Sequence, residues 1–410
     1  MIRSTLIPER EYFAACTLGL ERVLQQELTN LGAHRLELRA GGVGFHADLR
    51  TAYSANLWLR CAVRVQELVL KVDLNRERDL YPAIAAIDWD QYLTTHHTLA
   101  IDASVKDSCI RHSGYAAMRT KDAIVDQQRR KIGRRSSVDT GSPHLRLKLV
   151  LRNDRLLLYR DYSGESLHKR GYRKIQVKSP LNEAIAAGLL LHSDFDGRSF
   201  LVDPMCGSGT FLIEAALIAT DRAPGWMRHF AFEKWPDFEG ALWDRLREEA
   251  TARIRHDVPL LLEGADRHRG AIEIARAAAQ SAGVDSCMLL HCKDIRSFVP
   301  TRKPQIVVVN PPYGERIGAG EDLLDSWNGL LEFLKGCAAG VRVGVLSGDP
   351  KLSACLDLPA ARQTQVMNGP IKCQWIEARL GAGLRSRPDE ASVSASAEPA
   401  IQPPSIPEDG

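Results

Sequence analysis

The sequence lacks any stretch of about 18 apolar residues without a charge, so we expect no membrane-spanning helix. The N-terminus, MIRSTLIPEREYFAAC, has no apolar segment after its first Arg, and we expect no secretory signal. The nine cysteines are odd in number and include no CxxC pair, which argues against a disulfide framework and against a zinc site. We therefore predict a cytoplasmic protein with reduced thiols, no membrane and no metal.

The composition indicates a folded chain of several domains. Its 410 residues exceed the usual domain length of about 150 residues. Hydrophobic residues make up 44% and charged residues 26%, the balance of a globular protein. The net charge of +3 does not by itself indicate a polyanionic partner. Residues 382–410 are rich in Ala, Ser, Pro and Glu, which predicts a disordered tail.

Hydrophobic periodicity divides the remaining chain into an α+β half and an α/β half. Residues 1–60 and 61–165 mix alternating strands with helices, and the second unit begins at 61 or already near 44. After a linker over 166–178, residues 179–381 alternate short apolar strands with helices. That rhythm predicts a doubly wound parallel sheet, which binds ligands beyond the carboxyl ends of its strands. The segment 221–258 is aromatic-rich and predicts an insertion with its own small apolar cluster.

The segment LVDPMCGSGTFLIEAA, residues 201–216, predicts a ligand loop between a strand and a helix. It lacks the third glycine of the dinucleotide fingerprint, where Leu212 stands, and it lacks the lysine of a phosphate loop. The ligand is therefore not expected to be held by a pyrophosphate. A strand-end carboxylate suits an ammonium and hydroxyl groups, as in S-adenosylmethionine. The candidate cofactor residues of this loop are Asp203, Pro204, Cys206, Gly207 and Gly209.

Two further acids follow the next two predicted strands. Asp266 ends LLLEGAD and is a candidate to accept hydrogen bonds from ribose hydroxyls. Asp294 ends HCKD and is a candidate to accept from an adenine amino group. Each signal is weak alone, because an acid in an exposed turn is common. Three acids in chain order at three strand ends together favour one cofactor site.

The segment VVVNPPYGER, residues 307–316, carries the strongest chemical signal. Its prolines have a fixed φ and no N–H, so the loop that follows the strand is rigid. We predict that Asn310 and the carbonyl of Pro311 accept both hydrogens of an exocyclic amine and aim its nitrogen at a sulfonium methyl. Pro312 stiffens the exit, and Tyr313 stacks on the base.

Two basic clusters in the first half of the chain are candidate phosphate contacts. A charge run alone is as often a solvated helix face, but two clusters outside the catalytic half favour RNA binding. The candidates are Arg111, Arg119, Lys121, Arg129, Arg130, Lys131, Lys169, Arg170, Arg173 and Lys174.

The motifs DPMCGSGT, GAD, CKD and NPPYGER are similar to those of class I S-adenosylmethionine-dependent methyltransferases. With RDYSGESLHKRGYR at 160–173, and with GGVGFHADL and SGYAAMRTKDAIVDQ, residues of about 10–380 resemble the bacterial 23S ribosomal RNA guanine-N2 methyltransferase family. The resemblance implies a ferredoxin-like region, a THUMP RNA-binding domain and a Rossmann-like catalytic domain. It implies guanine-N2 methylation of 23S ribosomal RNA within an immature or partly assembled large subunit. The family's cofactor residues would fall on Asp203, Gly207, Gly209, Asp266 and Asp294.

Three alternatives stay open from the sequence. A transfer-RNA guanine-N2 methyltransferase would share both the RNA module and the NPPY motif. A DNA adenine-N6 methyltransferase would share NPPY but has no use for a THUMP-like half. A non-catalytic ribosomal RNA-binding assembly factor needs only the basic clusters.

Overall fold

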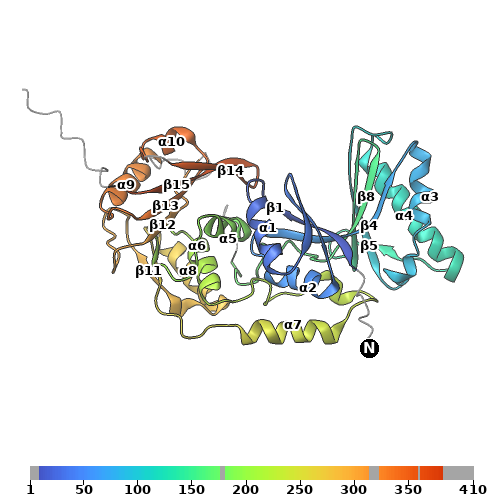
Figure 1. The fold of residues 1–410 in the computed structure, drawn as a ribbon, viewed down its shortest axis with the longest axis horizontal. Coiled ribbons are helices and arrows are strands. Elements are labelled where there is room, and N and C mark those ends of the chain that lie inside the picture. Colours follow the sequence, from blue (N-terminus) through green and yellow to red (C-terminus); the bar gives the residue numbers. More distant parts are fainter. Residues whose placement is uncertain (1–8, 176–180, 314–322, 359–360, 382–410) are drawn as a thin grey trace, which may run out of the picture.

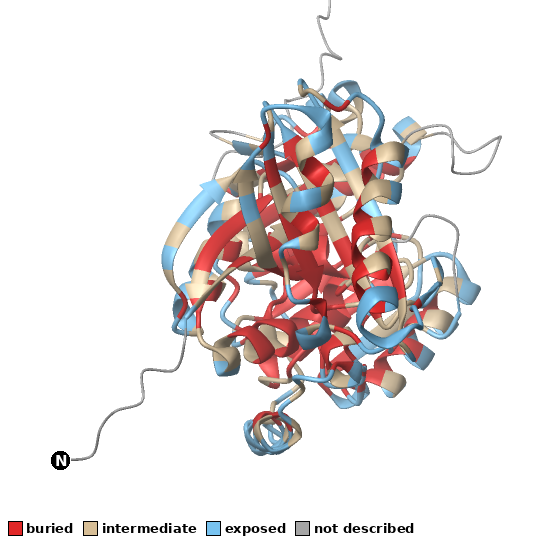
Figure 2. Ribbon diagram, turned by 90° about the vertical axis from the view of Figure 1, so that its right-hand side faces the viewer, coloured by how far each residue is buried: buried red, intermediate tan, exposed pale blue. Residues whose placement is uncertain are grey.

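The computed structural model describes residues 9–175, 181–313, 323–358 and 361–381, which form two sheets with helices packed on them (Figure 1). The predicted disordered tail, 382–410, lies outside the described residues, as does part of the predicted linker. Buried residues gather in the interior, and exposed residues follow the outer surface (Figure 2). No helix in the described ranges is long and apolar enough to cross a membrane.

The N-terminal half forms one eight-stranded sheet of order β2-β3-β1-β4-β8-β7-β5-β6. The strand β4 lies in the second predicted unit but joins the two, since it pairs with β1 over its first residues and with β8 over the rest. The ferredoxin-like and THUMP-like parts therefore share a continuous backbone ladder. The strands are β1 Arg10–Cys16, β2 His34–Arg39, β3 Gly42–Ala47, β4 Ala62–Asp73, β5 Thr98–Lys106, β6 Ser137–Val138, β7 Leu145–Arg152 and β8 Arg155–Asp161.

Four α-helices cover this sheet: α1 Glu21–Asn30, α2 Leu49–Trp58, α3 Leu80–Ala85 and α4 Ser113–Ile132. The helix α2 starts at an Asp48 cap, whose carboxylate accepts from Thr51 N at 2.8 Å. The helix α4 buries Ala116, Ala123 and Ile124 and exposes the three basic residues of its last turn. It ends at Gly133, whose φ of +74° is the left-handed conformation that glycine adopts without strain.

The second half is a seven-stranded sheet of order β11-β10-β9-β12-β13-β15-β14. Its first five strands in this order are parallel, and chain order reverses between the neighbours β9 and β12. The predicted parallel sheet is incomplete, because β15 and β14 close it as an antiparallel hairpin. The strands are β9 Leu201–Asp203, β10 Leu262–Asp266, β11 Met288–Cys292, β12 Ile306–Val309, β13 Arg342–Ser347, β14 Arg362–Asn368 and β15 Ile371–Arg379.

The helices of this half are α5 Glu183–His192, α6 Thr210–Ala219, α7 Gly240–Ala252, α8 Arg269–Ala282, α9 Leu323–Lys335 and α10 Pro350–Ala354. Both α5 and α6 are buried on nearly all sides, whereas α8 buries one face only. The helix α6 therefore lies in the interior and runs from the ligand loop towards the segment that precedes α7.

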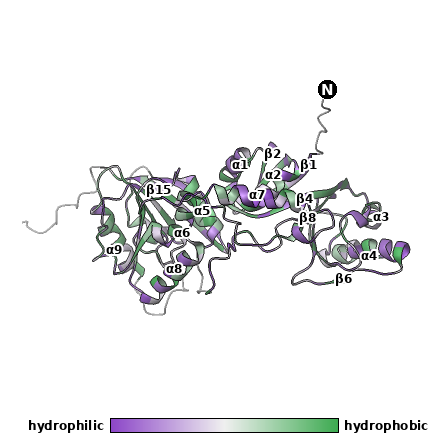
Figure 3. Cartoon of the chain, turned by 90° about the horizontal axis from the view of Figure 1, so that it is seen from below, coloured by the Kyte–Doolittle hydropathy of each residue, from purple (hydrophilic) through white to green (hydrophobic). Residues whose placement is uncertain are grey.

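The predicted insertion forms an aromatic cluster, in which Phe230, Phe232 and Trp243 contact one another, but this cluster also packs on the N-terminal half. The insertion carries α7 beneath the junction of the two halves and beside α2 (Figures 1 and 3). The ring of Phe232 stacks on Tyr53 at 4.2 Å, and Trp235 meets Tyr162 edge-on at 4.8 Å. Trp235 Nε1 also donates to the carbonyl of His144 at 2.9 Å. The aromatic residues of 221–258 thus attach the catalytic half to the N-terminal sheet.

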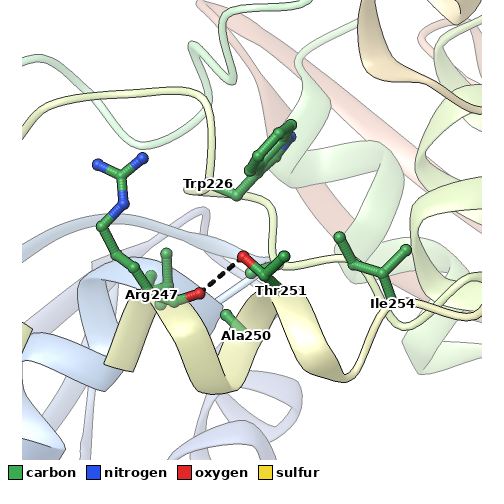
Figure 4. A pocket seen from close by; sticks show the side chains of 7 residues that line it. Trp226, Arg247, Ala250, Thr251 and Ile254 are labelled. Carbon is green, nitrogen blue, oxygen red and sulfur yellow. Dashed lines mark hydrogen bonds between the residues drawn. The ribbon is translucent and has the colours of Figure 1, made fainter. Parts of the chain in front are cut away.

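A small pocket lies between α7 and α2 (Figure 4). Thr251 on its wall donates its hydroxyl to the carbonyl of Arg247, one turn earlier in α7, so this hydroxyl is used within the helix. The lining is mainly apolar and belongs to the contact between the insertion and α2: Leu57, Ala223, Trp226, Arg247, Ala250, Thr251 and Ile254.

Candidate active site

The turn after β9 is a tight loop fixed by backbone hydrogen bonds. Cys206 N donates to the carbonyl of Ala265 at 2.9 Å, and Gly209 N donates to the carbonyl of Cys206 at 2.8 Å. Gly207 and Gly209 have φ values of +52° and +75°, which L side chains rarely adopt. A Cβ on Gly207 would meet nothing within 4 Å, so this part of the loop borders open space. Backbone conformation explains the need for glycine here.

Asp266 fastens this loop to the end of the neighbouring strand β10. Its Oδ2 accepts from Gly207 N at 2.9 Å, and its Oδ1 accepts from His268 N at 2.8 Å. Carboxylate oxygens can accept further hydrogen bonds beyond these two. The predicted ribose acceptor therefore also shapes the predicted cofactor loop.

Asp203 is a buried carboxylate at the end of β9, with 2% of its surface exposed. Burial raises its pKa well above the ordinary value, and the nearby charge of Asp266 acts in the same direction. Within the described chain its one recorded hydrogen bond comes from Met205 N at 3.2 Å. A buried carboxylate with spare acceptor capacity fits a ligand that brings hydroxyl or ammonium donors.

Asp294 follows β11, one strand further from the centre. Its side chain is 41% exposed, and Oδ1 accepts from Arg296 N at 2.9 Å. Lys293 N, one residue earlier, donates to the carbonyl of Asp266 at 3.1 Å. Because β9, β10 and β11 are adjacent and parallel, the structure brings the three predicted acids to one edge of the sheet.

Asn310 follows β12, on the other side of the reversal point from β10. Its Oδ1 atom is buried and has no hydrogen-bond partner in the described part of the chain. Leaving a buried acceptor unsatisfied costs about 1–3 kcal/mol, so this oxygen would gain from a donor that a ligand brings. The carbonyl of Pro312 is already used, since it accepts from Trp327 Nε1 at 2.9 Å. An amide oxygen is therefore available beside the carboxyl end of β9.

Tyr313 is held by groups that the sequence analysis missed. Its hydroxyl accepts from Asn368 Nδ2 at 3.0 Å, and Cys373 Sγ lies at 3.6 Å. Its ring lies against Gly348, where an added Cβ would approach Cδ2 of the ring to 2.4 Å. Burial raises the pKa of the phenol well above its usual range. The ring is therefore neutral and fixed by β14, β15 and the end of β13.

The two predicted basic clusters differ in the structure. The first lies on and around α4, where Lys131 pairs with Asp88 and Asp90, both at 2.8 Å, and Arg119 lies over the Tyr81 ring at 4.8 Å. Half of this cluster, namely Arg129, Arg130 and Lys131, lies at the exposed C-terminal end of the helix. RNA contact by the first cluster stays a prediction.

In the second cluster, the predictions for Arg170 and Arg173 are wrong. Arg170 is 3% exposed and pairs with the buried Glu214 at 3.4 Å. Arg173 pairs with Glu183 at 2.8 Å and donates to Thr210 Oγ1 at 2.7 Å. Both guanidinium groups pair with side chains inside the protein, because the segment that connects the two halves is packed between them. Lys169 and Lys174 are exposed and stay candidates.

The cysteine in the ligand loop has the properties of a buried structural thiol. Burial raises the pKa of Cys206 well above its ordinary value, which disfavours the thiolate. Across the described ranges, no group of three or more His, Cys, Asp or Glu side chains could hold a metal ion.

Comparison with known protein families gives three adjoining matches. Residues 11–66 match the RlmL ferredoxin-like domain, and residues 75–161 match the THUMP domain. Residues 170–377, just over half of the chain, match the RMKL-like methyltransferase domain. The three matches follow one another in the order that the two sheets show.

Solved structures share this whole arrangement. SMU.472, described as a putative methyltransferase complexed with SAH, is 30% identical, with a TM-score of 0.81 over 92% of this chain and 99% of that one. A possible methylase from Clostridium difficile 630 is 26% identical, with a TM-score of 0.83 over 93% and 100%. A predicted N6-adenine-specific DNA methylase from Listeria monocytogenes is 28% identical, with a TM-score of 0.82 over 90% and 96%.

Proposed function

This chain belongs to the RMKL-like methyltransferase family, and from that membership we propose that it methylates the exocyclic N2 amine of a guanine in 23S ribosomal RNA. It is an S-adenosylmethionine-dependent methyltransferase with an RlmL-type ferredoxin-like domain and a THUMP domain. The guanine-N2 and 23S assignments are the proposal.

The observation that carries the proposal is the buried, unpartnered Oδ1 of Asn310 at the reversal point of the sheet. An exocyclic amine is a weak base conjugated to its ring, so it needs orientation more than deprotonation. Asn310 Oδ1 and the carbonyl of Pro311 accept its two hydrogens, which leaves the nitrogen lone pair directed at the methyl group. Holding the two reacting atoms in line lowers the barrier by several kcal/mol, with an upper range of about 7–11 kcal/mol for ideal alignment.

The three strand-end carboxylates bind the methyl donor in this proposal. S-adenosylmethionine, when bound, supplies an electrophilic methyl on a sulfonium. Asp203 accepts from the donor's ammonium or hydroxyl groups, Asp266 accepts from its ribose, and Asp294 accepts from its adenine amine. Pro204, Cys206, Gly207 and Gly209 form the loop against which the donor lies. Cys206 contributes backbone and shape, since its buried thiol stays protonated.

The RNA half selects and places the substrate. A THUMP domain and the basic residues around α4 suit phosphate contacts, which position RNA without reading its bases. The reacting guanine has to leave its stack, at a cost of a few kcal/mol that is smaller in partly folded RNA. This favours an immature or partly assembled large subunit as substrate, with Tyr313 holding the extruded ring.

A second candidate is methylation of adenine N6 in DNA. The name of the Listeria relative describes such an enzyme, and an Asn-Pro-Pro-Tyr loop can accept both hydrogens of an adenine amine as well. The THUMP match favours RNA over DNA. A transfer-RNA guanine remains the closest rival within RNA.

One experiment separates these substrates. The purified chain is incubated with methyl-labelled S-adenosylmethionine and separate pools of 23S ribosomal RNA from immature subunits, transfer RNA and unmethylated DNA. The products are digested to nucleosides and identified by mass spectrometry. We expect label in N2-methylguanosine from the ribosomal pool. Label in N6-methyladenine from DNA, or in transfer RNA alone, would overturn the proposal.

A further inference from the structure

The helix α6 carries two polar side chains in an otherwise apolar sequence, TFLIEAALIA. These are Thr210, its first residue, and Glu214, one turn later. Residues four apart lie on the same face of a helix. Both are buried, at 3% and 0% exposure, and the carbonyl of Leu217 follows on the next turn. Since Thr210 comes directly after Gly209, this polar face starts at the end of the cofactor loop.

The partners of this face come from outside the catalytic sheet. Arg173 donates to Thr210 Oγ1 at 2.7 Å. Glu214 pairs with Arg170 at 3.4 Å and accepts from the hydroxyl of Tyr172 at 3.1 Å. Each turn of this face is thus held by the segment that connects the two halves.

The last contact comes from the N-terminal half, which consists of the ferredoxin-like and THUMP domains and is called the RNA-binding half below. Arg60, two residues after α2, donates to the carbonyls of Leu217 at 3.3 Å and Arg222 at 3.1 Å. The backbone carbonyl of Arg60 in turn accepts from the Arg170 guanidinium. We call this set of contacts the polar seam: Arg60, Arg170, Tyr172, Arg173, Thr210 and Glu214.

Stability alone does not account for such a seam. Buried ion pairs lose about as much free energy in desolvation as they regain, and apolar residues of similar volume are often as stable. Hydrogen bonds do fix direction and distance, which apolar packing does not. The polar seam therefore fixes the position of α6 relative to the RNA-binding half. It fixes the position of the loop that ends at Gly209 in the same way.

We infer that Thr210 and Glu214 are positioning residues through which the RNA-binding half sets the geometry of the cofactor loop. They do not touch the reacting groups. They act through Gly207 and Gly209, whose backbone shapes the loop. The inference rests on the donor-binding part of the proposed function and not on the identity of the methylated base.

The first test removes one hydroxyl. Thr210→Val keeps the shape of the side chain and leaves the pair between Arg173 and Glu183 in place. Calorimetry with S-adenosylmethionine and no RNA should show a dissociation constant about ten-fold higher, since a ten-fold change corresponds to about 1.4 kcal/mol, the order of one hydrogen bond from a charged group. Thr210→Ser restores the hydroxyl and should bind within about two-fold of the wild type. An unchanged constant in Thr210→Val overturns the inference.

The second test compares two buried carboxylates. Glu214→Gln weakens the seam, whereas Glu67→Gln is a matched control in the N-terminal sheet, where Glu67 accepts from Tyr162 at 3.0 Å and pairs with Arg10 at 3.0 Å. Both variants should melt at a lower temperature. Only Glu214→Gln should weaken donor binding. If both lower the affinity equally for the same loss of stability, the seam is structural and the inference fails. Donor binding is read without RNA, so a wrong substrate assignment would leave this result unaffected.

Discussion

Asn368 Nδ2 donates a 3.0 Å hydrogen bond to the hydroxyl of Tyr313, and so ties the loop after β12 to the end of β14. The contact links two segments more than fifty residues apart in sequence. It holds the aromatic ring against Gly348, where a side chain would collide with it. The β14–β15 hairpin, which closes the sheet at one edge, therefore also supports the proposed base-binding residue.

We predict that Asn368→Leu lowers the efficiency of methyl transfer and leaves the affinity for S-adenosylmethionine unchanged. A hydrogen bond of this kind contributes about 1 kcal/mol net, so kcat/KM for RNA should fall about five-fold. Tyr313→Phe, which keeps the ring and loses the same bond, should match it. Tyr313→Ala, which removes the ring, should be far worse. Steady-state kinetics at saturating S-adenosylmethionine test this, and equal effects of Phe and Ala at position 313 would contradict a stacking role.

Asn310→Ala should abolish methyl transfer while donor binding persists. Removing a positioned polar group at a reacting centre costs about 100- to 1000-fold in rate. Deleting an unpartnered buried oxygen removes its desolvation cost, so we expect the melting temperature to change little. Turnover within a few-fold of the wild type would refute the role. Calorimetric titration with S-adenosylmethionine gives the control.

Much of this site was predictable because its signals are local. A strand-end Asp203, positive-φ glycines and an Asn-Pro-Pro loop each depend on a few consecutive residues, and the structure brings them to one sheet edge. The antiparallel hairpin was also visible in principle. The turn residues Gly369 and Pro370 lie between two alternating runs, which favours a hairpin with a two-residue loop.

The errors came from residues whose environment depends on distant parts of the chain. Arg170 and Arg173 have the local appearance of a basic phosphate-binding run. Their partners, Glu214 and Glu183, lie on buried helices that no local pattern connects to them. In the same way, Phe232 packs with the other aromatic residues of the insertion, but its stacking on Tyr53 could not be predicted because Tyr53 is far away in sequence. The sequence shows the charge and hydrophobicity of each residue, but whether that residue is buried depends on tertiary contacts.

Reversing charge at the end of α4 should weaken RNA binding. We predict that Arg129→Glu with Arg130→Glu lowers RNA affinity and makes its salt dependence shallower, by about 0.7–0.9 in slope per lost phosphate contact. Arg245→Glu on α7, a helix that also carries Asp244, Glu248 and Glu249, is the control and should change little. Filter binding at several salt concentrations measures both quantities. An unchanged slope in the double variant would exclude this end of α4 from the RNA interface.

Asp203→Asn should make the donor-free protein more stable and the donor complex weaker. Burial raises the pKa of Asp203 above its ordinary value of 3.8, so the folded protein holds this proton more tightly than the unfolded chain does. The contribution of Asp203 to stability is therefore complete below 3.8 and is lost as pH rises through the raised pKa. Above that window the wild type contains a buried charge, which Asn avoids.

Ligand binding should have the opposite dependence on pH, because donor hydroxyl or ammonium groups favour the ionised carboxylate. Affinity of the wild type for S-adenosylmethionine should rise with pH through the same window, and that of Asp203→Asn should stay flat and lower. Melting curves and calorimetry over a pH series that begins near 3.8 and rises through the raised pKa measure both effects. Asp294→Asn, at an exposed position, should leave the donor-free melting temperature nearly unchanged. If Asp203→Asn is instead less stable at neutral pH, this carboxylate is a structural group in the free protein, and its proposed contact with the donor loses its physical basis.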